Sequence, residues 1–600
     1  MMSRPVRVFK KRRGGPGRGH KKSECSENTV IVDVNEENNA EASNESRPKN
    51  VCVTDNTCAS EKKLSAAKEG YTANLKSNNQ QINNGNIIID IGILSKILNS
   101  VAKCKHCDSH DTLLCSENVS GRVGLASSLD LSCSTCSAKQ SFYTLKHCEV
   151  GYEVNARLVY GLRCIGKGQA AGKTLCAVMN LPQPPTRFIT YNKFLTTAIR
   201  ECAELSMSLA IREAIVCNEG SKDLTVAIDG TWQKRGHTSN NGVVSATSVA
   251  IGKVIDVEVL TKYCQTCVIY KHNKNKLKQH QEGGKCKANY TGVSGGMESV
   301  GAVTIFERSM KKYDVRYVNY LGDGDSKAFK RVVESKPYGD TEITKLECVG
   351  HVQKRMGTRL RKIKKDHSGK RLGDGKFISG QGRLSDKEID NLQTYYGAAI
   401  RRNANKLEQM RQDVWATYFH KMSTDKSPQH ALCPKGKDSW CKFNRAVATG
   451  ELYTHKHSLP SCVGQIIKPI YRSLADNELL RKCLHGKTQN PNESFNSVIW
   501  CRLPKNVFVG YDTLVIGVLD AVLTFNEGNS GRVKVLQCLG IEPGFNALNI
   551  FQQIDNIRIR KAKIKQESRA KTTRMLQRNE KRSREDEDDL DGPEYSSGMY

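Results

Sequence analysis

The chain has 600 residues, enough for several domains and a full enzyme core, so its 23 cysteines are not needed as the staples of a small secreted fold. Its 93 Lys and Arg against 62 Asp and Glu give a formal charge of +31, which attracts polyanions and makes nucleic acid the first partner to consider. Met1–Lys22 contains no apolar segment of signal-peptide length, and Ile87–Leu98 is too short to cross a bilayer. We therefore expect a reducing compartment, metal-bound thiolates and no membrane partner.

Residues 1–86 are rich in Asn, Ser, Glu and Lys and contain scarcely an aromatic residue. Such a segment buries too little apolar surface to fold alone, so we expect a disordered arm. The run Lys10-Lys11-Arg12-Arg13 has the composition of a nuclear address, of a phosphate contact or of an ordinary solvated tail. The first of these interpretations predicts a nuclear protein.

Residues 87–150 contain two Cys-x-x-Cys pairs separated by polar sequence. Cys104 and Cys107 form the first pair, and Cys133 and Cys136 form the second. Paired knuckles of this spacing are typical of a zinc ribbon, in which four thiolates hold Zn²⁺ tetrahedrally. The alternative, unrelated free thiols, seldom gives two such pairs so close together. We expect a small zinc-binding module here.

The remaining sequence divides by its hydrophobic periodicity. Apolar runs of strand length start at Leu224 and continue beyond Val349, and helical spacing precedes and interrupts them. The fold class is therefore α/β, a mixed sheet with a helical insertion. The expected segments are a helical connector at 151–220, a core at 221–540, a helical insertion within the core at 385–484 and a charged tail at 541–600.

A polar, Lys-rich stretch at 263–294 interrupts the strand-rich block and contains a second candidate metal site. Three thiolates and one imidazole would close a tetrahedral zinc site there. His272 could replace His280 as the ligand, and a free Lys-rich loop is the alternative to any site. The candidate ligands are Cys264, Cys267, His280 and Cys286.

A third group of Cys and His residues has irregular spacing, closer to that of a helical core than to that of a metal site. These residues could form a third site, but the spacing does not favour one. Its members are His430, Cys433, Cys441, His455, His457 and Cys462.

Two acidic residues follow apolar runs of strand length. Val226–Trp232 predicts a buried strand that presents Asp229 at its end. Val315–Leu321 predicts a second strand, after which Asp323 stands at the terminus and Asp325 is placed to cap the next helix. Asp323 is therefore the expected metal ligand, and Asp325 is the alternative.

Glu493 lies in the opening turn of a helix expected from Asn490 to Trp500. Its structural explanation is a capping box, with Asn490 as the N-cap and Pro491 at the first helical position. Together with two strand-end aspartates in a basic protein, however, Glu493 suits a two-metal site. Clustered carboxylates in such a site clamp the attacking and leaving oxygens of a phosphodiester.

These motifs resemble the Mutator-like transposases over roughly Ile87 to Leu539. The family's catalytic domain resembles ribonuclease H and carries an Asp, Asp, Glu triad, with a Cys-x-x-His pair between the second Asp and the Glu. The resemblance implies Asp229, Asp323 and Glu493 as the triad, with Asp325 as the fallback for the second position. The matching segments are Ala227–Trp232, Gly322–Ser326, Cys348–His351 and Asn492–Asn496.

The resemblance implies a ribonuclease-H-like mixed sheet and cut-and-paste DNA transposition. A metal-activated water would cleave DNA at terminal inverted repeats, and the freed 3′-hydroxyl would attack target DNA. The implied cofactors are two Mg²⁺ or Mn²⁺ ions at the carboxylates and structural Zn²⁺ at the cysteines. The implied partners are double-stranded DNA, both transposon ends and target, and further copies of the chain, with no small-molecule cofactor. The alternative is a domesticated, non-catalytic zinc-containing DNA-binding protein.

Basic residues recur with helical spacing directly after His351. The apolar positions Val352, Met356 and Leu360 mark one face of a helix, and the basic residues share a different face. A solvated helix face is the usual explanation for such charges, but their nearness to the expected active site favours contact with DNA phosphates. These candidate DNA-binding residues are Arg355, Arg359 and Lys362.

Overall fold

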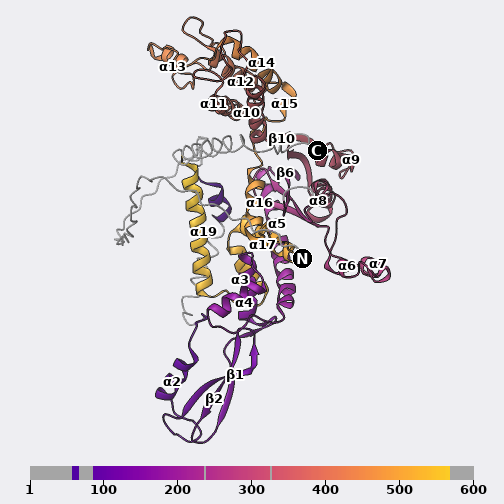
Figure 1. The fold of residues 1–600 in the computed structure, drawn as a ribbon, viewed down its shortest axis with the longest axis vertical. Helices are drawn as coiled ribbons and strands as arrows, with labels where there is room; N and C mark the ends of the chain where they lie inside the picture. Colours follow the sequence, from indigo (N-terminus) through magenta and orange to yellow (C-terminus); the bar gives the residue numbers. More distant parts are fainter. Residues whose placement is uncertain (1–56, 66–84, 235–237, 324–326, 568–600) are drawn as a thin grey trace, which may run out of the picture. The chain divides into compact units, whose positions relative to one another are not determined.

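The computed structural model describes residues 57–65, 85–234, 238–323 and 327–567 (Figure 1). The basic run Lys10–Arg13 and the alternative acid Asp325 lie outside the described residues. The mixed α/β class predicted from the sequence is confirmed, with helices and three separate sheets in the described part of the chain.

A short piece of the segment expected to be disordered is ordered. Residues 59–65 are helical, and Cys58 and Leu64 are buried. They pack in one cluster with Leu548 and Ile559 of α19 (Phe545–Gln566). This stretch folds because helices from the other end of the sequence supply the apolar surface that it lacks.

An antiparallel sheet carries the first two cysteine pairs. Its strand order is β1-β2-β3, and Leu113 at the start of β1 lies opposite Cys133 at the end of β2. Because β3 begins three residues after Cys136, both Cys-x-x-Cys pairs lie at the same end of the sheet. The bounds are α2 (Ile91–Val101), β1 (Leu113–Val123), β2 (Ala126–Cys133), β3 (Lys139–Tyr143), and the paired strands β4 (His147–Cys148) and β5 (Gly151–Tyr152).

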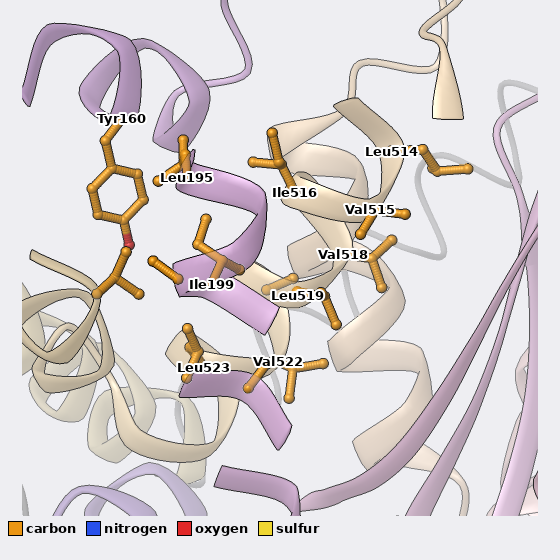
Figure 2. Close-up of a cluster of buried hydrophobic side chains, with 14 of the residues drawn as sticks. Tyr160, Leu195, Ile199, Leu514, Val515, Ile516, Val518, Leu519, Val522 and Leu523 are labelled. Carbon is orange, nitrogen blue, oxygen red and sulfur yellow. The ribbon is translucent and has the colours of Figure 1, made fainter. Parts of the chain in front are cut away.

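Three helices follow, and the longest packs against a helix from the C-terminal part of the chain. Figure 2 shows Leu195 and Ile199 of α5 beside Leu519 and Leu523 of α17, all of them buried in one hydrophobic cluster. Residues 514–526 of α17 are buried without interruption, as in a helix enclosed on all sides by other elements. The bounds are α3 (Glu153–Cys164), α4 (Gln169–Val178), α5 (Phe188–Cys217) and α17 (Tyr511–Glu527).

The central sheet has five strands in the order β10-β9-β6-β7-β8. Strands β6, β7 and β8 are antiparallel neighbours, whereas β9 runs parallel to both β6 and β10. The carboxyl ends of β6, β9 and β10 therefore meet at one edge of the sheet. The bounds are β6 (Asp223–Trp232), β7 (Asn241–Ser248), β8 (Val254–Thr261), β9 (Arg316–Gly322) and β10 (Thr344–Glu347).

Helices cover both faces of this sheet. Val243 belongs to the cluster that includes α5 and α17, whereas its neighbour Val244 belongs to the cluster built on α8. Because successive side chains of a strand point to opposite faces, α8 lies on one face and the α5–α17 pair on the other. All eight residues of β7 are buried accordingly. The elements between β8 and β10 are α6 (Gln265–Ile269), α7 (Lys274–Glu282), η1 (Ser294–Gly296), α8 (Met297–Tyr313) and α9 (Lys327–Glu334).

A group of helices with its own hydrophobic core interrupts the chain after β10. The chain leaves and returns at the same place, because the Glu347 amide donates to the Lys482 carbonyl at 2.9 Å and the Val349 amide donates to the Lys487 carbonyl at 3.2 Å. Helical structure thus starts well before the predicted 385–484. The bounds are α10 (Val349–Asp366), α11 (Asp386–Arg402), α12 (Leu407–Met422), α13 (Lys442–Thr449), α14 (Ser461–Leu474) and α15 (Asn477–Arg481).

Helices α16 (Asn490–Arg502), α17, α18 (Ser530–Cys538) and α19 complete the described chain. Helix α19 lies in the segment expected as a charged tail, and its buried Leu548 and Ile559 hold it to its neighbours. Nowhere in the described residues does a helix combine the length and the apolar character needed to span a membrane.

Candidate active site

The register of the central sheet brings Asp229 and Asp323 together. Ala227 of β6 lies opposite Leu321 of β9 in a parallel pair. Each aspartate follows its member of this pair by two residues, so both lie on the same side of the sheet just beyond the last paired residues of β6 and β9. Asp229 does not end its strand as the sequence predicts, because β6 continues to Trp232 in its pairing with β7. Asp229 is half-buried, and Asp323 is exposed.

The start of α16 is fixed across the same part of β6 and β9. The Gln489 amide group donates to the Ile228 carbonyl at 2.8 Å and to the Leu321 carbonyl at 3.4 Å. The Asn492 amide group donates to the Ala227 carbonyl at 3.0 Å. These bonds to buried backbone set the position of the first turn of α16, which contains Glu493.

The capping interpretation of Glu493 is wrong. Gln489, not Asn490, is the residue that precedes the helix, and its side chain makes no capping hydrogen bond. The Glu493 carboxylate is 54% exposed, and its Oε1 lies 3.7 Å from Nε2 of His351. Glu493 therefore faces the part of the sheet that carries Asp229 and Asp323.

His351, in the first turn of α10, connects two of the three acids. Its Nδ1 forms an ion pair with Asp323, and its Nε2 faces Glu493. The hydrogen bond to Asp323, with a smaller contribution from Cys348, raises the pKa of His351 to about 10. The same bond lowers the pKa of Asp323. At neutral pH an imidazolium thus stands between two carboxylates.

Cys348 links this histidine to α16. It is buried at the N-cap of α10 and accepts a hydrogen bond from the Gln489 backbone amide at 3.3 Å. Burial opposes ionisation of the thiol, but the hydrogen bonds with His351 and Gln489 and the charge of His351 together outweigh burial and lower the pKa of Cys348. Among the described residues, neither Cys348 nor His351 belongs to a set of three close metal-ligand atoms. The pair joins α10, β9 and α16 at the acidic site.

A fourth carboxylate, Glu298, lies at the site. It is in the first turn of α8, and its Cγ would lie 2.8 Å from a Cβ added at Gly230, the residue after Asp229. Burial and the charges of Asp229 and Asp323 raise the pKa of Glu298 to about 7. Sequence reasoning missed Glu298, because acidic residues are common in the first turn of a helix, where the helix dipole stabilises their negative charge.

Asp229 is held in place by Asn496, which follows Glu493 in α16. The Asn496 amide group donates to its Oδ2 at 2.7 Å. Burial and the charge of Asp323 nevertheless raise the pKa of Asp229 to about 6. A carboxyl whose pKa is raised by a neighbouring negative charge favours a cation between the two groups.

Among the described residues, the carboxylate oxygens of this site do not converge on one point. Within the described residues, the sets of three or more candidate ligand atoms lying within 4.8 Å of one another are Cys and His sets, and the acids form none. A site for two divalent ions about 3.5–4 Å apart does not require all of its ligand atoms to lie within so short a distance. The all-oxygen donor set suits Mg²⁺ or Mn²⁺.

Residues 85–441, more than half of the chain, match the family model described as Mutator-like transposase. The chain belongs to the Mutator-like transposase family. Asp229, Glu298, Asp323, Cys348 and His351 of this transposase lie within the match, which ends before Glu493. No curated protein matches the chain. Membership of the family implies transposase function and DNA binding.

The first two cysteine pairs of this Mutator-like transposase form one cluster. The Sγ atoms of Cys104 and Cys136 are 3.6 Å apart, and those of Cys107 and Cys133 are 3.7 Å apart. Zn–S bonds of about 2.3 Å in a tetrahedron put two sulfurs about 3.8 Å apart. The cluster could hold zinc.

The candidate ligands in the Lys-rich insertion also come together. Sγ of Cys264 lies 3.3 Å from Nε2 of His280, and the Sγ atoms of Cys267 and Cys286 are 3.4 Å apart. His280, rather than the exposed His272, occupies the fourth place. This set could also hold zinc.

The three candidate DNA-binding residues of α10 have different surroundings. Arg355 forms an ion pair at 2.7 Å with the buried carboxylate of Glu347. Arg359 is exposed and donates to Oγ of Ser473 at 2.9 Å. Lys362 is exposed. Arg355 therefore neutralises a buried charge, whereas Arg359 and Lys362 present theirs to solvent.

Proposed function

We propose that this Mutator-like transposase cuts and rejoins DNA with Asp229, Asp323 and Glu493 as a metal-binding triad on a ribonuclease-H-like core. The observation that carries the proposal is the matched position of Asp229 in β6 and Asp323 directly after β9, with α16 hydrogen-bonded to both of these adjacent parallel strands. A mixed five-stranded sheet with helices on both faces supports the assignment of the core.

The chain's own residues prepare the site before any reaction. The triad would hold two Mg²⁺ or Mn²⁺ ions, which when bound supply an activated water and stabilise charge on the phosphodiester. Asn496 orients Asp229 through the bond to Oδ2. His351 holds a proton beside Asp323 and so lowers the pKa of that carboxyl, while its Nε2 faces Glu493.

The overall reaction would be cut-and-paste transposition, with cleavage at terminal inverted repeats and strand transfer by the freed 3′-hydroxyl. A charge of +31 supports binding of double-stranded DNA, both ends and target. Action as a multimer and a nuclear location belong to the same proposal. Zinc at the clusters of Cys104 and of Cys264 would be structural, because four protein ligands leave no open position.

Cleavage can be tested with a plasmid carrying the DNA that flanks the gene for this chain. In Mg²⁺ or Mn²⁺, the wild type should nick and join it, whereas Asp229→Asn and Glu493→Gln should lose both activities and keep duplex binding in fluorescence anisotropy. The matched control is Asp314→Asn, at the opposite end of β9, where the left-handed φ of 57° suits Asn as well as Asp.

Asp314→Asn should cut like the wild type. Cleavage that persists in both active-site variants would remove these acids from the mechanism. A wild type that binds the DNA tightly but never nicks it would instead favour the domesticated, non-catalytic DNA-binding protein.

A further inference from the structure

A third Cys and His cluster lies within the helices that follow β10, away from the two predicted zinc sets in sequence. His420 is in the last turn of α12, and Cys441 caps the start of α13. His430 and Cys433 come from the connection between these helices. Three of the four side chains are buried, and their ligand atoms all lie within 4.8 Å of one another.

The spacing of these atoms matches tetrahedral coordination. Nδ1 of His420 is 3.8 Å from Sγ of Cys433 and 3.6 Å from Sγ of Cys441. Nδ1 of His430 is 3.8 Å and 3.4 Å from the same two sulfurs. Zn–N bonds of about 2.0–2.1 Å and Zn–S bonds of about 2.3 Å put N and S about 3.5–3.6 Å apart in a tetrahedron. Both imidazoles present the same nitrogen to both thiols.

We propose that His420, His430, Cys433 and Cys441 bind a structural Zn²⁺ ion, a third zinc site in this chain. Two imidazoles and two thiolates form a closed donor set for Zn²⁺ and leave no position for substrate. The site goes beyond the proposed transposase chemistry and does not depend on it.

A hydrogen-bonded chain behind His430 supports this role. Nε2 of His430 lies 2.8 Å from Oγ of Ser423, which lies 2.9 Å from Nε2 of His455. Nδ1 of His455 faces the Asp425 carboxylate at 2.6 Å. When each group in this chain donates its hydrogen bond toward Asp425, the proton of His430 is on Nε2. Its Nδ1 is then free to bind a metal. Metal-ligating histidines commonly have such a partner on the other nitrogen.

Aromatic rings close the remaining sides. Phe443 stacks on His430 with ring centroids 4.3 Å apart, and Trp440 lies edge-on to His420 at 5.1 Å. The ligands thus sit in a partly apolar enclosure that limits water. Such an enclosure suits a site that holds a fold together.

The ion would anchor a long irregular connection. No helix or strand forms between the end of α12 at Met422 and the start of α13 at Lys442. Connections longer than about 12–15 residues without regular structure are uncommon in compact domains and need another source of order. A zinc ion held by both ends and the middle of this connection supplies it.

Zinc content of the purified full chain tests the proposal. The wild type should hold three zinc ions per chain by inductively coupled plasma mass spectrometry, and His420→Ala should hold one fewer. His457→Ala is the matched control, because His457 is an exposed histidine of the same region outside the cluster. It should keep the wild-type content. Equal zinc in wild type and His420→Ala would overturn the proposal.

A second variant gives an answer even if His420→Ala fails to fold. Cys104→Ser combined with Cys267→Ser removes one thiolate from each of the other clusters. This variant should retain one ion per chain, and Co²⁺ in its place should give the absorption bands of tetrahedral mixed nitrogen and sulfur ligation. A chain that retains no ion, or a wild type whose Cys433 and Cys441 are joined by a disulfide in non-reduced peptide maps, would exclude the site.

Discussion

Asn496 donates a hydrogen bond at 2.7 Å to Oδ2 of Asp229, which is 267 residues away in sequence. The bond stabilises the charged form of Asp229 against burial and against the neighbouring Asp323. It also fixes which oxygen of Asp229 remains available to a cation. Helix α16 therefore supplies Glu493 and also, through Asn496, positions Asp229.

Removing this bond should weaken metal binding. Asn496→Ala should lower Mn²⁺ affinity by about 10–100-fold, because an oriented carboxylate loses its supporting donor. Titration followed by electron paramagnetic resonance measures the change. Ser497→Ala, at the next and exposed position of α16, is the control and should bind Mn²⁺ like the wild type. Unchanged affinity in Asn496→Ala would mean that Asp229 does not bind the ion.

Glu298→Gln should stabilise the metal-free protein at alkaline pH. The pKa of Glu298 rises from 4.5 to about 7, so its ionisation costs stability as pH climbs from about 4.5 and the cost is complete above about 7. The variant should gain on the order of 1–3 kcal/mol at pH 8 and little at pH 5.

Denaturant unfolding in EDTA at both pH values measures this gain. Glu307→Gln, an exposed acid on the same helix, should show no such pH-dependent gain. An equal effect of Glu298→Gln at pH 5 and pH 8 would contradict the assignment of its raised pKa. Added Mg²⁺ should stabilise the wild type more than Glu298→Gln, because the cation offsets the carboxylate repulsion.

Acid should unfold the protein partly through Asp520. This buried acid accepts from Arg502 at 2.5 Å, from Arg532 at 2.9 Å and from the Tyr160 hydroxyl at 3.0 Å. Burial opposes its ionisation, but the two arginines outweigh burial and lower its pKa to about 2. Its stabilising contribution is present above about 3.8 and is lost as pH falls toward 2.

Asp520→Asn should cost about 3–5 kcal/mol at pH 7, because two buried arginines lose their counter-charge. The loss should shrink as pH falls from 4 to 2, which circular dichroism across an acid titration would detect. Asp512→Asn, on the exposed start of the same helix, serves as the control. A pH-independent loss would point to packing instead of charge.

Two basic residues of α10 should behave differently toward DNA. Lys362→Ala should weaken binding to any duplex and reduce the salt dependence of log K by about one unit of slope, because one phosphate contact is lost. Arg355→Ala should mainly destabilise the fold, by about 1–3 kcal/mol, because it leaves buried Glu347 unpaired. Anisotropy at several salt concentrations and thermal melting separate the two effects. If Arg355→Ala weakened DNA binding and Lys362→Ala destabilised the fold, the roles of the two residues would be the reverse of those assigned.

The sequence predicted those site residues that stand in a recognisable local pattern, such as an apolar run or a regular ligand spacing. Asp229 and Asp323 end apolar strand runs, and the Cys-x-x-Cys pair of Cys104 and Cys107 repeats at Cys133. Glu493 was ambiguous, because its place depends on the bonds of Gln489 and Asn492 to distant strands. Such bonds leave no trace in spacing.

Other residues could not have been found from sequence, because tertiary packing alone defines them. Glu298 joins the acids only once α8 lies on the sheet. His420 is separated from its partners by a helix end and an irregular connection, so it lacks ligand spacing. Cys58 and Leu64 lie in polar sequence and become buried only against α19.

The backbone bonds of Glu347 to Lys482 and of Val349 to Lys487 bring together the two ends of the helical insertion beside the sheet. Because both ends of the insertion are held at one point, a change in the length of its flexible loops alters the free energy of loop closure only slightly. The change is about 0.6 kcal/mol for each doubling of a flexible loop. The length of the insertion can therefore vary while Glu493 stays in register with the strands.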